Sequence, residues 1–216
     1  MILSPGRNFV FVHIPKTGGT SMALALEDRA HKDDILIGDT PKAIKRRARL
    51  KKLSPKGRLW KHSTLADIDG ILTPEELSEM FIFTLVRNPW DRMVSYYHWL
   101  RAQRFDHPAV ALAAKTDFEG FVLHPQTIRT LTAAPYASYV SDAHGREQPT
   151  TFVRLEALQE DMTPVIEHLG FRPAITRTNA SDRPSDYRSL YSATTAEAVA
   201  KMCATDIARF GYAFDA

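Results

Sequence analysis

The sequence has little cysteine and no long apolar run. Cys203 is its only cysteine, so an internal disulfide and a structural zinc site built on cysteines are both excluded. No apolar run approaches the ~20 residues needed to cross a bilayer. The first residues, MILSPGRN, lack the basic start and apolar core of a signal peptide. We therefore predict a soluble, cytoplasmic protein without a membrane span, and nothing in the sequence implies a metal.

Acidic residues are missing from one stretch of the chain. Pro41 to Lys61 holds ten Lys or Arg and no Asp or Glu, whereas the remaining residues carry 18 basic and 25 acidic side chains. The stretch has only a weak apolar stripe, so we expect a partly exposed helix or a mobile insertion. Its charge is either a solvated face or a means of attracting an acidic substrate or nucleic acid.

The sequence is rich enough in apolar residues to build a core. They make up 44% of the 216 residues, and we expect one domain spanning residues 1–216, with 41–61 as a basic insertion. The polar segment 171–191 is predicted to close over a ligand.

The stretch FVFVHIPKTGGTSMALAL, residues 9–26, has the pattern of a strand, a phosphate loop and a helix. Residues 9–14 are β-branched or aromatic, and residues 21–27 have the Ala and Leu content of a helix. Gly18 and Gly19 let the backbone approach a ligand, and helix-start N–H groups favour anions. With the charge of Lys16, the turn suits the phosphates of a nucleotide, although a purely structural turn is the alternative.

The turn departs from the pattern of nucleotide-binding P-loops. In G-x-x-x-x-G-K-[ST] the lysine follows the glycines, but Lys16 precedes Gly18 and Gly19. A Mg²⁺ site of the Walker type is therefore unsupported.

A second anion site is predicted after a second apolar run. FIFTLV, residues 81–86, is typical of a central parallel strand, and Pro89 begins a helix. Arg87 lies just beyond the carboxyl end of this strand, where open α/β sheets bind ligands. Ser95 lies on the helix and could hold the same anion. Two anion sites at two strand ends suit a nucleotide with phosphates on both sides of its ribose.

The remaining elements complete an α/β fold, which we expect to be a three-layer, P-loop-like domain with a central parallel sheet flanked by helices. Further strands are expected at 35–37 and 151–154. Helices are expected from a Thr73 cap to Met80, over 116–122 with Thr116 as cap, over 156–169, and over 194–210 with Thr194 and Glu197 as a capping box.

Both motifs resemble those of a known family. FVHIPKTGGTSM resembles the 5′-phosphosulfate loop, and FTLVRNPWDRMVSYY the 3′-phosphate motif, of sulfotransferases that use 3′-phosphoadenosine 5′-phosphosulfate (PAPS). The match is closer to the carbohydrate-type branch, which includes heparan 2-O-sulfotransferase and many bacterial proteins. The similarity extends through WKHSTLADI, TFVRLEALQEDM, NASDRPSDYRSLY and DIARFGYAF, and so covers most of the chain.

The resemblance implies sulfuryl transfer from PAPS to an acceptor hydroxyl or amine. Lys16 would stabilise charge on the bridging oxygen as its bond to sulfur breaks. Donors to the 5′-phosphate would come from Thr17, Gly18, Gly19, Thr20 and Ser21. Arg87 and Ser95 would hold the 3′-phosphate; otherwise Arg87 is a structural salt bridge and Ser95 a surface hydroxyl.

A histidine is the implied general base. The family carries its catalytic histidine between the two binding motifs, and His62 in KHST stands at that position. A substrate-orienting or structural role for His62 is the alternative. His13 is predicted to be a packing or loop-fixing residue, and His98 is predicted to lie in the core or on the surface of a helix. Arg188 could reach the nucleotide, and Asn179 and Ser181 are weaker candidates.

Two rival functions remain open from the sequence. One is a P-loop-like kinase or other phosphotransferase, and the other is a non-catalytic nucleic-acid-binding protein that uses the basic segment. The favoured acceptor is the hydroxyl of a carbohydrate or glycolipid, and other small molecules or a protein tyrosine stay open. No nucleic-acid partner is expected, and the oligomeric state cannot be read.

Overall fold

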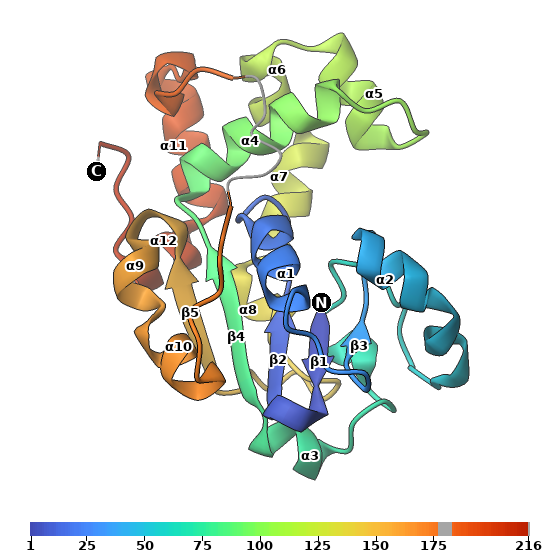
Figure 1. The fold of residues 1–216 in the computed structure, drawn as a ribbon. Coiled ribbons are helices and arrows are strands. Elements are labelled where there is room, and N and C mark those ends of the chain that lie inside the picture. Colours follow the sequence, from blue (N-terminus) through green and yellow to red (C-terminus); the bar gives the residue numbers. More distant parts are fainter. Residues whose placement is uncertain (177–182, 216) are drawn as a thin grey trace. The chain divides into compact units, whose positions relative to one another are not determined.

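The computed structural model describes residues 1–176 and 183–215 (Figure 1). The described chain divides into two compact units. The first comprises Met1–Val86 and residues 136–176, and the second comprises Arg87–Pro135 and residues 183–215. The first unit holds the sheet, and the second is built from helices.

Five strands form one sheet, in the order β3-β1-β2-β4-β5. They are β1 (Ile2–Ser4), β2 (Phe9–Val12), β3 (Ile35–Leu36), β4 (Phe81–Val86) and β5 (Thr150–Arg154). Strands β2, β4 and β5 run parallel, while β1 is antiparallel to β2 and β3. The α/β class is confirmed, but the sheet is mixed rather than all parallel. Only four residues join β1 to β2, too few for the crossover that a parallel pair requires.

One face of the sheet carries the main core of the first unit. Alternate residues of a strand point to the same face, and Phe9, Phe11, Phe83 and Leu85 do so here. They pack with Met22 and Leu26 of α1 (Gly19–Glu27) and with Val165 and Leu169 of α10 (Thr163–Leu169). This packing fixes the end of β2 against the start of α1, where the predicted phosphate turn lies.

The other helices of the first unit are short. They are α2 (Pro41–Arg46), α3 (Pro74–Glu79), α8 (Tyr136–Tyr139) and α9 (Leu158–Asp161), with 3-10 turns η1 (Pro5–Arg7), η2 (Arg47–Lys52), η3 (Ala66–Ile68) and η4 (Leu155–Ala157). The capping box predicted at Thr73 is confirmed, because Thr73 and Glu76 exchange side-chain to backbone hydrogen bonds. In the basic segment, α2 and η2 bear out the expectation of a partly exposed helix up to Lys52.

The helix predicted over residues 156–169 is broken into η4, α9 and α10. Pro164 cannot continue an incoming helix but is well suited to the first turn of the next one, α10. The predicted end is confirmed, because Gly170 adopts a left-handed conformation with φ of 71°.

The second unit consists of α4 (Pro89–Arg101), α5 (Pro108–Lys115), α6 (Phe118–Leu123), α7 (Pro125–Thr132), the 3-10 turn η5 (Tyr187–Leu190), α11 (Ala193–Met202) and α12 (Ala204–Phe210). Trp90, Met93 and Tyr97 of α4 pack with Phe121 of α6 and Val199 of α11. These three residues therefore mark the packed face of α4.

Two caps in the second unit differ from the prediction. Asp117, not Thr116, caps α6 and accepts a hydrogen bond from the Gly120 N–H at 2.8 Å. Thr116 instead donates to the Leu112 carbonyl, at the end of the preceding helix.

The last predicted helix is two helices, α11 and α12. Helix α11 is capped by Ser192 and Thr195 rather than by Thr194 and Glu197. The side chain of each of the two capping residues accepts a hydrogen bond from the backbone N–H of the other.

No helix among the described residues is both long and apolar enough to cross a bilayer.

Candidate active site

The turn from β2 to α1 has an unusual backbone. Lys16, a residue with a side chain, has a φ of 66°, and Gly18 has a φ of 90°. Positive φ values suit glycine and are strained elsewhere, so the Lys16 conformation is one that the surroundings must hold in place. Such strain is typical of ligand-binding turns.

Helix α1 begins at this turn without a side-chain cap from the described residues. Its N-cap, Gly18, offers only its carbonyl, which accepts from Ser21 at 3.1 Å. The first N–H groups of a helix have no partner within the helix, and together with the helix dipole they attract anions. The N–H groups of Gly19 and Thr20 are therefore suited to a phosphate.

The side chain of Thr17 stabilises the turn. Its side chain is fully buried, and its hydroxyl donates to the Ile14 carbonyl at 2.9 Å. Thr17 was predicted to supply a donor to the 5′-phosphate, and in the structure its hydroxyl is already bonded within the loop. The backbone of Thr17 is what remains for a ligand.

The His13 ring leaves no room for a side chain at Gly19. A Cβ on Gly19 would lie 2.0 Å from Cδ2 of the His13 ring, far inside van der Waals contact. The buried His13 ring, predicted to be a packing residue, therefore packs directly against the start of α1.

His62 lies against the same histidine. The two rings meet edge to face with centroids 4.6 Å apart, and Nδ1 of His62 is 2.8 Å from the His13 carbonyl oxygen. A carbonyl oxygen only accepts, so Nδ1 carries the hydrogen and Nε2 keeps its lone pair. This tautomer gives His62 the nitrogen that a general base needs.

Burial lowers the pKa of His62 to about 4, although the hydrogen bond to His13 acts in the opposite direction. His62 is therefore neutral near pH 7. Burial also holds the pKa of His13 well below its usual value, and the positive charges of Lys61 and Lys16 contribute to this shift. His13 thus lies within electrostatic range of both Lys16 and His62, the two predicted catalytic residues.

The predicted 3′-phosphate residues belong to the second unit. Arg87 binds Asp91 with two hydrogen bonds, from Nε at 2.8 Å and from Nη2 at 2.5 Å. Asp91 also pairs with Arg183 of the polar segment, at 2.5 Å. The salt bridge considered for Arg87 exists, and it holds the Arg87 guanidinium group against Asp91 in the first turn of α4.

Ser95 lies one helical turn beyond Asp91. Residues four apart share a helix face, so Asp91 and Ser95 lie on one side of α4, and Arg87, which precedes the helix, is joined to that side by its bonds to Asp91. The start of α4 is closed by a cap, because the Asn88 side chain accepts from the Trp90 N–H at 3.0 Å. An anion here would meet side chains rather than the helix backbone.

Arg188 lies on the exposed turn η5. It pairs with Asp186 at 2.8 Å, and its guanidinium lies 5.8 Å from the ring centre of Tyr187. Asn179 and Ser181 lie outside the described residues.

Three contributors to the candidate site were not singled out from the sequence. Asp91 stands four residues after Arg87 on a predicted helix, a spacing that signals an ion pair. The His13 carbonyl and Arg183 carry no such signal, since their partners are 49 and 92 residues away in the chain.

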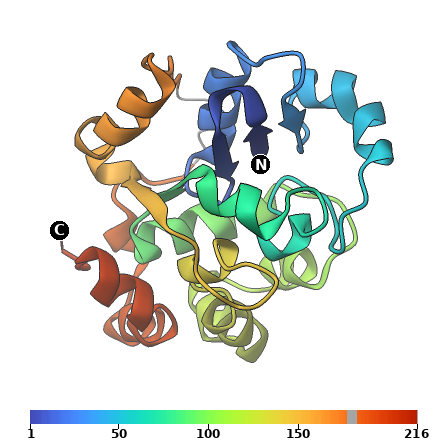
Figure 2. The same cartoon turned by 90° about the horizontal axis from the view of Figure 1, so that it is seen from below.

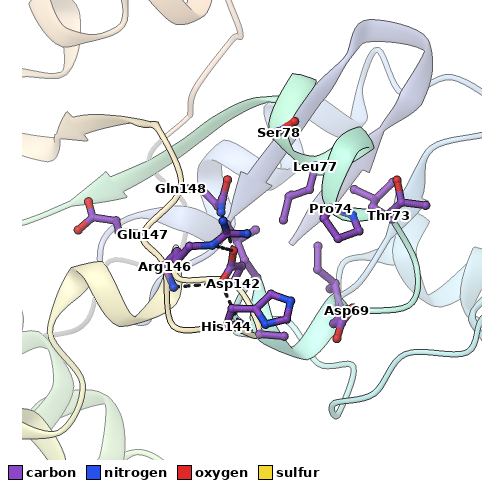
Figure 3. A pocket seen from close by; sticks show the side chains of 14 residues that line it. Asp69, Thr73, Pro74, Leu77, Ser78, Asp142, His144, Arg146, Glu147 and Gln148 are labelled. Carbon is purple, nitrogen blue, oxygen red and sulfur yellow. Dashed lines mark hydrogen bonds and ion pairs between the residues drawn. The ribbon is translucent and has the colours of Figure 1, made fainter.

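A pocket of about 280 Å³ lies elsewhere in the first unit (Figure 3). Leu65, Ile68 and Leu77 line it together with the loop around Asp142 and His144. Helix α3 directly precedes β4, and the loop around Asp142 and His144 directly precedes β5 (Figure 2). The pocket that these two segments line is therefore at the amino ends of the strands. The phosphate turn follows the carboxyl end of β2, at the opposite edge of the sheet.

Comparison with known proteins agrees with these motifs. No curated protein sequence matches the chain. The structure is similar to that of the mouse sulfotransferase SULT7A1 complexed with PAP, with a TM-score of 0.50 and 13% identity, over 97% of this chain and 87% of that one. At this identity the likeness establishes the fold. The model of the sulfotransferase family matches residues 1–213, and the chain therefore belongs to the sulfotransferase family.

Proposed function

We propose that the protein transfers the sulfuryl group of PAPS to a hydroxyl of a carbohydrate or glycolipid. The observation that carries the proposal is the β2–α1 turn, where strained Lys16 and an uncapped helix start stand beside a neutral histidine. The structural relative bound to PAP, the desulfated form of PAPS, supports the same donor. We propose further that the two units act together as one catalytic domain over residues 1–216.

The turn fits the 5′-phosphosulfate of the donor. Backbone N–H groups of Gly19 and Thr20 would bind the phosphate, and the backbone of Thr17 and Gly18 would line it. The side chain of Ser21, in the first turn of α1, would add a hydroxyl. Arg87 and Ser95 would bind the 3′-phosphate, and the pairing with Asp91 would keep Arg87 extended for it. The role of Arg188 stays a prediction.

His62 and Lys16 would then have separate roles in the reaction. The acceptor oxygen forms a bond to sulfur while the bond from sulfur to the phosphate oxygen breaks. Nε2 of His62 takes the proton of the acceptor hydroxyl, because Nδ1 is held by the His13 carbonyl. Lys16 stabilises the negative charge that the departing phosphate oxygen gains.

The low pKa of His62 has a direct consequence. A base that is protonated only near pH 4 is always available near pH 7, but it is weak until a neighbouring charge strengthens it. The negative charge of a bound phosphosulfate beside the turn would raise this pKa. His62→Ala is therefore expected to lose turnover, by about 10²–10⁴-fold, while nucleotide affinity is kept.

The location and the metal requirement also remain proposals. A cytoplasmic location rests on the single cysteine, Cys203, which is a buried free thiol. A reaction without a metal rests on Lys16, whose charge would neutralise the leaving group in the place of a cation.

Calorimetry with adenosine 3′,5′-bisphosphate and with ATP-Mg²⁺ tests the donor. The sulfotransferase reading predicts tight binding of the bisphosphate and weak binding of ATP. The reverse order would favour the phosphotransferase rival, and binding of DNA or RNA with steep salt dependence but no nucleotide binding would favour the nucleic-acid rival. A PAPS-dependent transfer assay on a panel of glycans then identifies the acceptor.

A further inference from the structure

Trp60 is a large exposed side chain beside the candidate base. Its exposed fraction is 44%, and its ring meets His62 edge to face with centroids 5.0 Å apart. A single exposed apolar side chain is common on protein surfaces, so the significant feature of Trp60 is its position beside the candidate base.

The orientation of Trp60 is built into the turn that carries it. Ser63 is fully buried, and its hydroxyl oxygen accepts from the Trp60 N–H at 2.9 Å. The same hydroxyl can donate to the carbonyls of Trp60 and Arg58, at 2.8 and 3.0 Å. Trp60 is therefore held near His62 by the backbone and does not depend on the packing of its ring.

Arg58 stands with its guanidinium 5.8 Å from the centre of the Trp60 ring. That group has no hydrogen bond or ion pair with any other residue in the described part of the chain, whereas the lysines on either side are paired. Lys56 binds Asp69 and Lys61 binds Asp39, both at 2.7 Å. Arg58 is thus the uncompensated cation of this turn.

The same imbalance extends through the basic segment. Five of its ten cations form no hydrogen bond or ion pair within residues 1–176 and 183–215: Lys45, Arg47, Lys51, Lys52 and Arg58. With no acidic residue of its own, the segment that precedes Trp60 in the chain carries an excess of positive charge, which attracts anions.

We propose that Trp60 and Arg58 form the acceptor subsite, and that the acceptor carries a negative charge beside a ring. The ring packs on Trp60, Arg58 binds the charge, and the reacting hydroxyl is thereby presented to Nε2 of His62. This inference rests on the proposed function, since it assigns the second substrate of the same site. Trp60 and Arg58 are specificity-determining residues in this account.

The test uses a pair of ligands that differ only in charge. One is an oligosaccharide of alternating glucuronate and N-acetylglucosamine, and the other is the same oligosaccharide with its carboxylates reduced to alcohols. Their affinities are measured by calorimetry on the full chain with adenosine 3′,5′-bisphosphate bound. A phenolic carboxylate is titrated in parallel, because it offers the same charge and ring from a different class of molecule.

The subsite predicts a specific pattern of losses. Carboxylate reduction should weaken binding to the wild type about tenfold. Arg58→Ala should lower the affinity for the charged ligand to the same extent and leave the affinity for the reduced ligand unchanged. Trp60→Ala should lower the affinity for both ligands about tenfold. Trp60→Phe keeps an aromatic ring and should retain most of the wild-type affinity.

Matched controls separate the subsite from general charge and from folding. Lys52→Ala removes an equally uncompensated cation of the segment, and Phe105→Ala removes an equally exposed aromatic ring of the second unit. Both should change either affinity less than twofold. Every variant should bind the bisphosphate as the wild type does, which shows that it is folded.

Three results would overturn the inference. One is a wild type that binds the bisphosphate but none of the three acceptor probes. Another is equal loss in Lys52→Ala and Arg58→Ala, and the third is an unchanged affinity in Trp60→Ala. A wild type that fails to bind the bisphosphate would instead refute the proposed donor and, with it, the proposed function.

Discussion

The β2–α1 turn and the β4–α4 turn follow parallel neighbouring strands but are built differently. The first has left-handed Lys16 and Gly18 and an uncapped helix. The second has proline at the first helical position and the Asn88 cap. A proline has no N–H and a cap occupies one, so the second turn has little backbone left to offer an anion.

Under the proposed function, the difference corresponds to two ways to recognise a phosphate. The β2–α1 turn would use the helix backbone, because side chains such as Thr17 and His13 shape the turn. The β4–α4 turn would use side chains, with Arg87 held in place by Asp91. We therefore expect substitutions at the first turn to act on chemistry and loop shape, and substitutions at the second to act on nucleotide affinity.

Among substitutions in the two turns, the largest effect is expected for Lys16→Ala. Loss of the charge next to the leaving oxygen should lower kcat by about 10²–10³-fold, with a smaller loss of nucleotide affinity. Steady-state kinetics with PAPS and calorimetry with the bisphosphate measure the two. Lys52→Ala is the control and should behave as the wild type, and an equal fall in both variants would show a nonspecific charge effect.

Arg87→Ala should act mainly on binding. Removing two charged hydrogen bonds to the 3′-phosphate should raise the Kd of the bisphosphate by about 10–100-fold. Asp91→Asn keeps the shape of the carboxylate but loosens Arg87, so a smaller increase is expected. If Asp91→Asn instead tightened binding, Asp91 would be a competitor of the phosphate rather than its support.

Gly19→Ala should destabilise the first turn through His13. The added Cβ would lie 2.0 Å from the His13 ring, and such overpacking costs about 1–3 kcal/mol. Because the His13 carbonyl holds His62, kcat should fall as well. Urea unfolding and kinetics measure the two effects. Gly38→Ala is the control, since its Cβ would meet nothing closer than 3.9 Å.

The smallest change is expected from pH. Since burial lowers the pKa of His62 to about 4, kcat/KM should stay level between pH 6 and 8. His62 binds a proton less readily in the folded state than in the unfolded state. The contribution of neutral His62 to the free energy of unfolding is therefore fully present above about pH 6.5. It is lost as the pH falls towards 4, because the unfolded chain is protonated first. A midpoint of kcat/KM between pH 6 and 7 would mean an exposed base.

The sequence was most informative where the chemistry is local. Lys16, Gly18 and Gly19 are adjacent, and both the strand before them and the helix after them follow from composition. The three-residue strand β1 was not predicted, because a run that short has no readable period.

The support of the candidate base could not be predicted for a different reason. His13 and His62 are 49 residues apart, and only the folded chain brings the carbonyl of one to the ring of the other. The hydrogen bond from the Thr17 hydroxyl to the Ile14 carbonyl could not be predicted either, because a hydroxyl in a loop has several possible partners.

The most direct test of the two-turn account compares adenosine 3′,5′-bisphosphate with adenosine 5′-monophosphate, which lacks the 3′-phosphate. The preference of the wild type for the bisphosphate should collapse in Arg87→Ala and persist in Gly18→Ala, where a left-handed φ of 90° strains the 5′-phosphate turn and weakens both ligands alike. A preference that survives in Arg87→Ala would contradict the account.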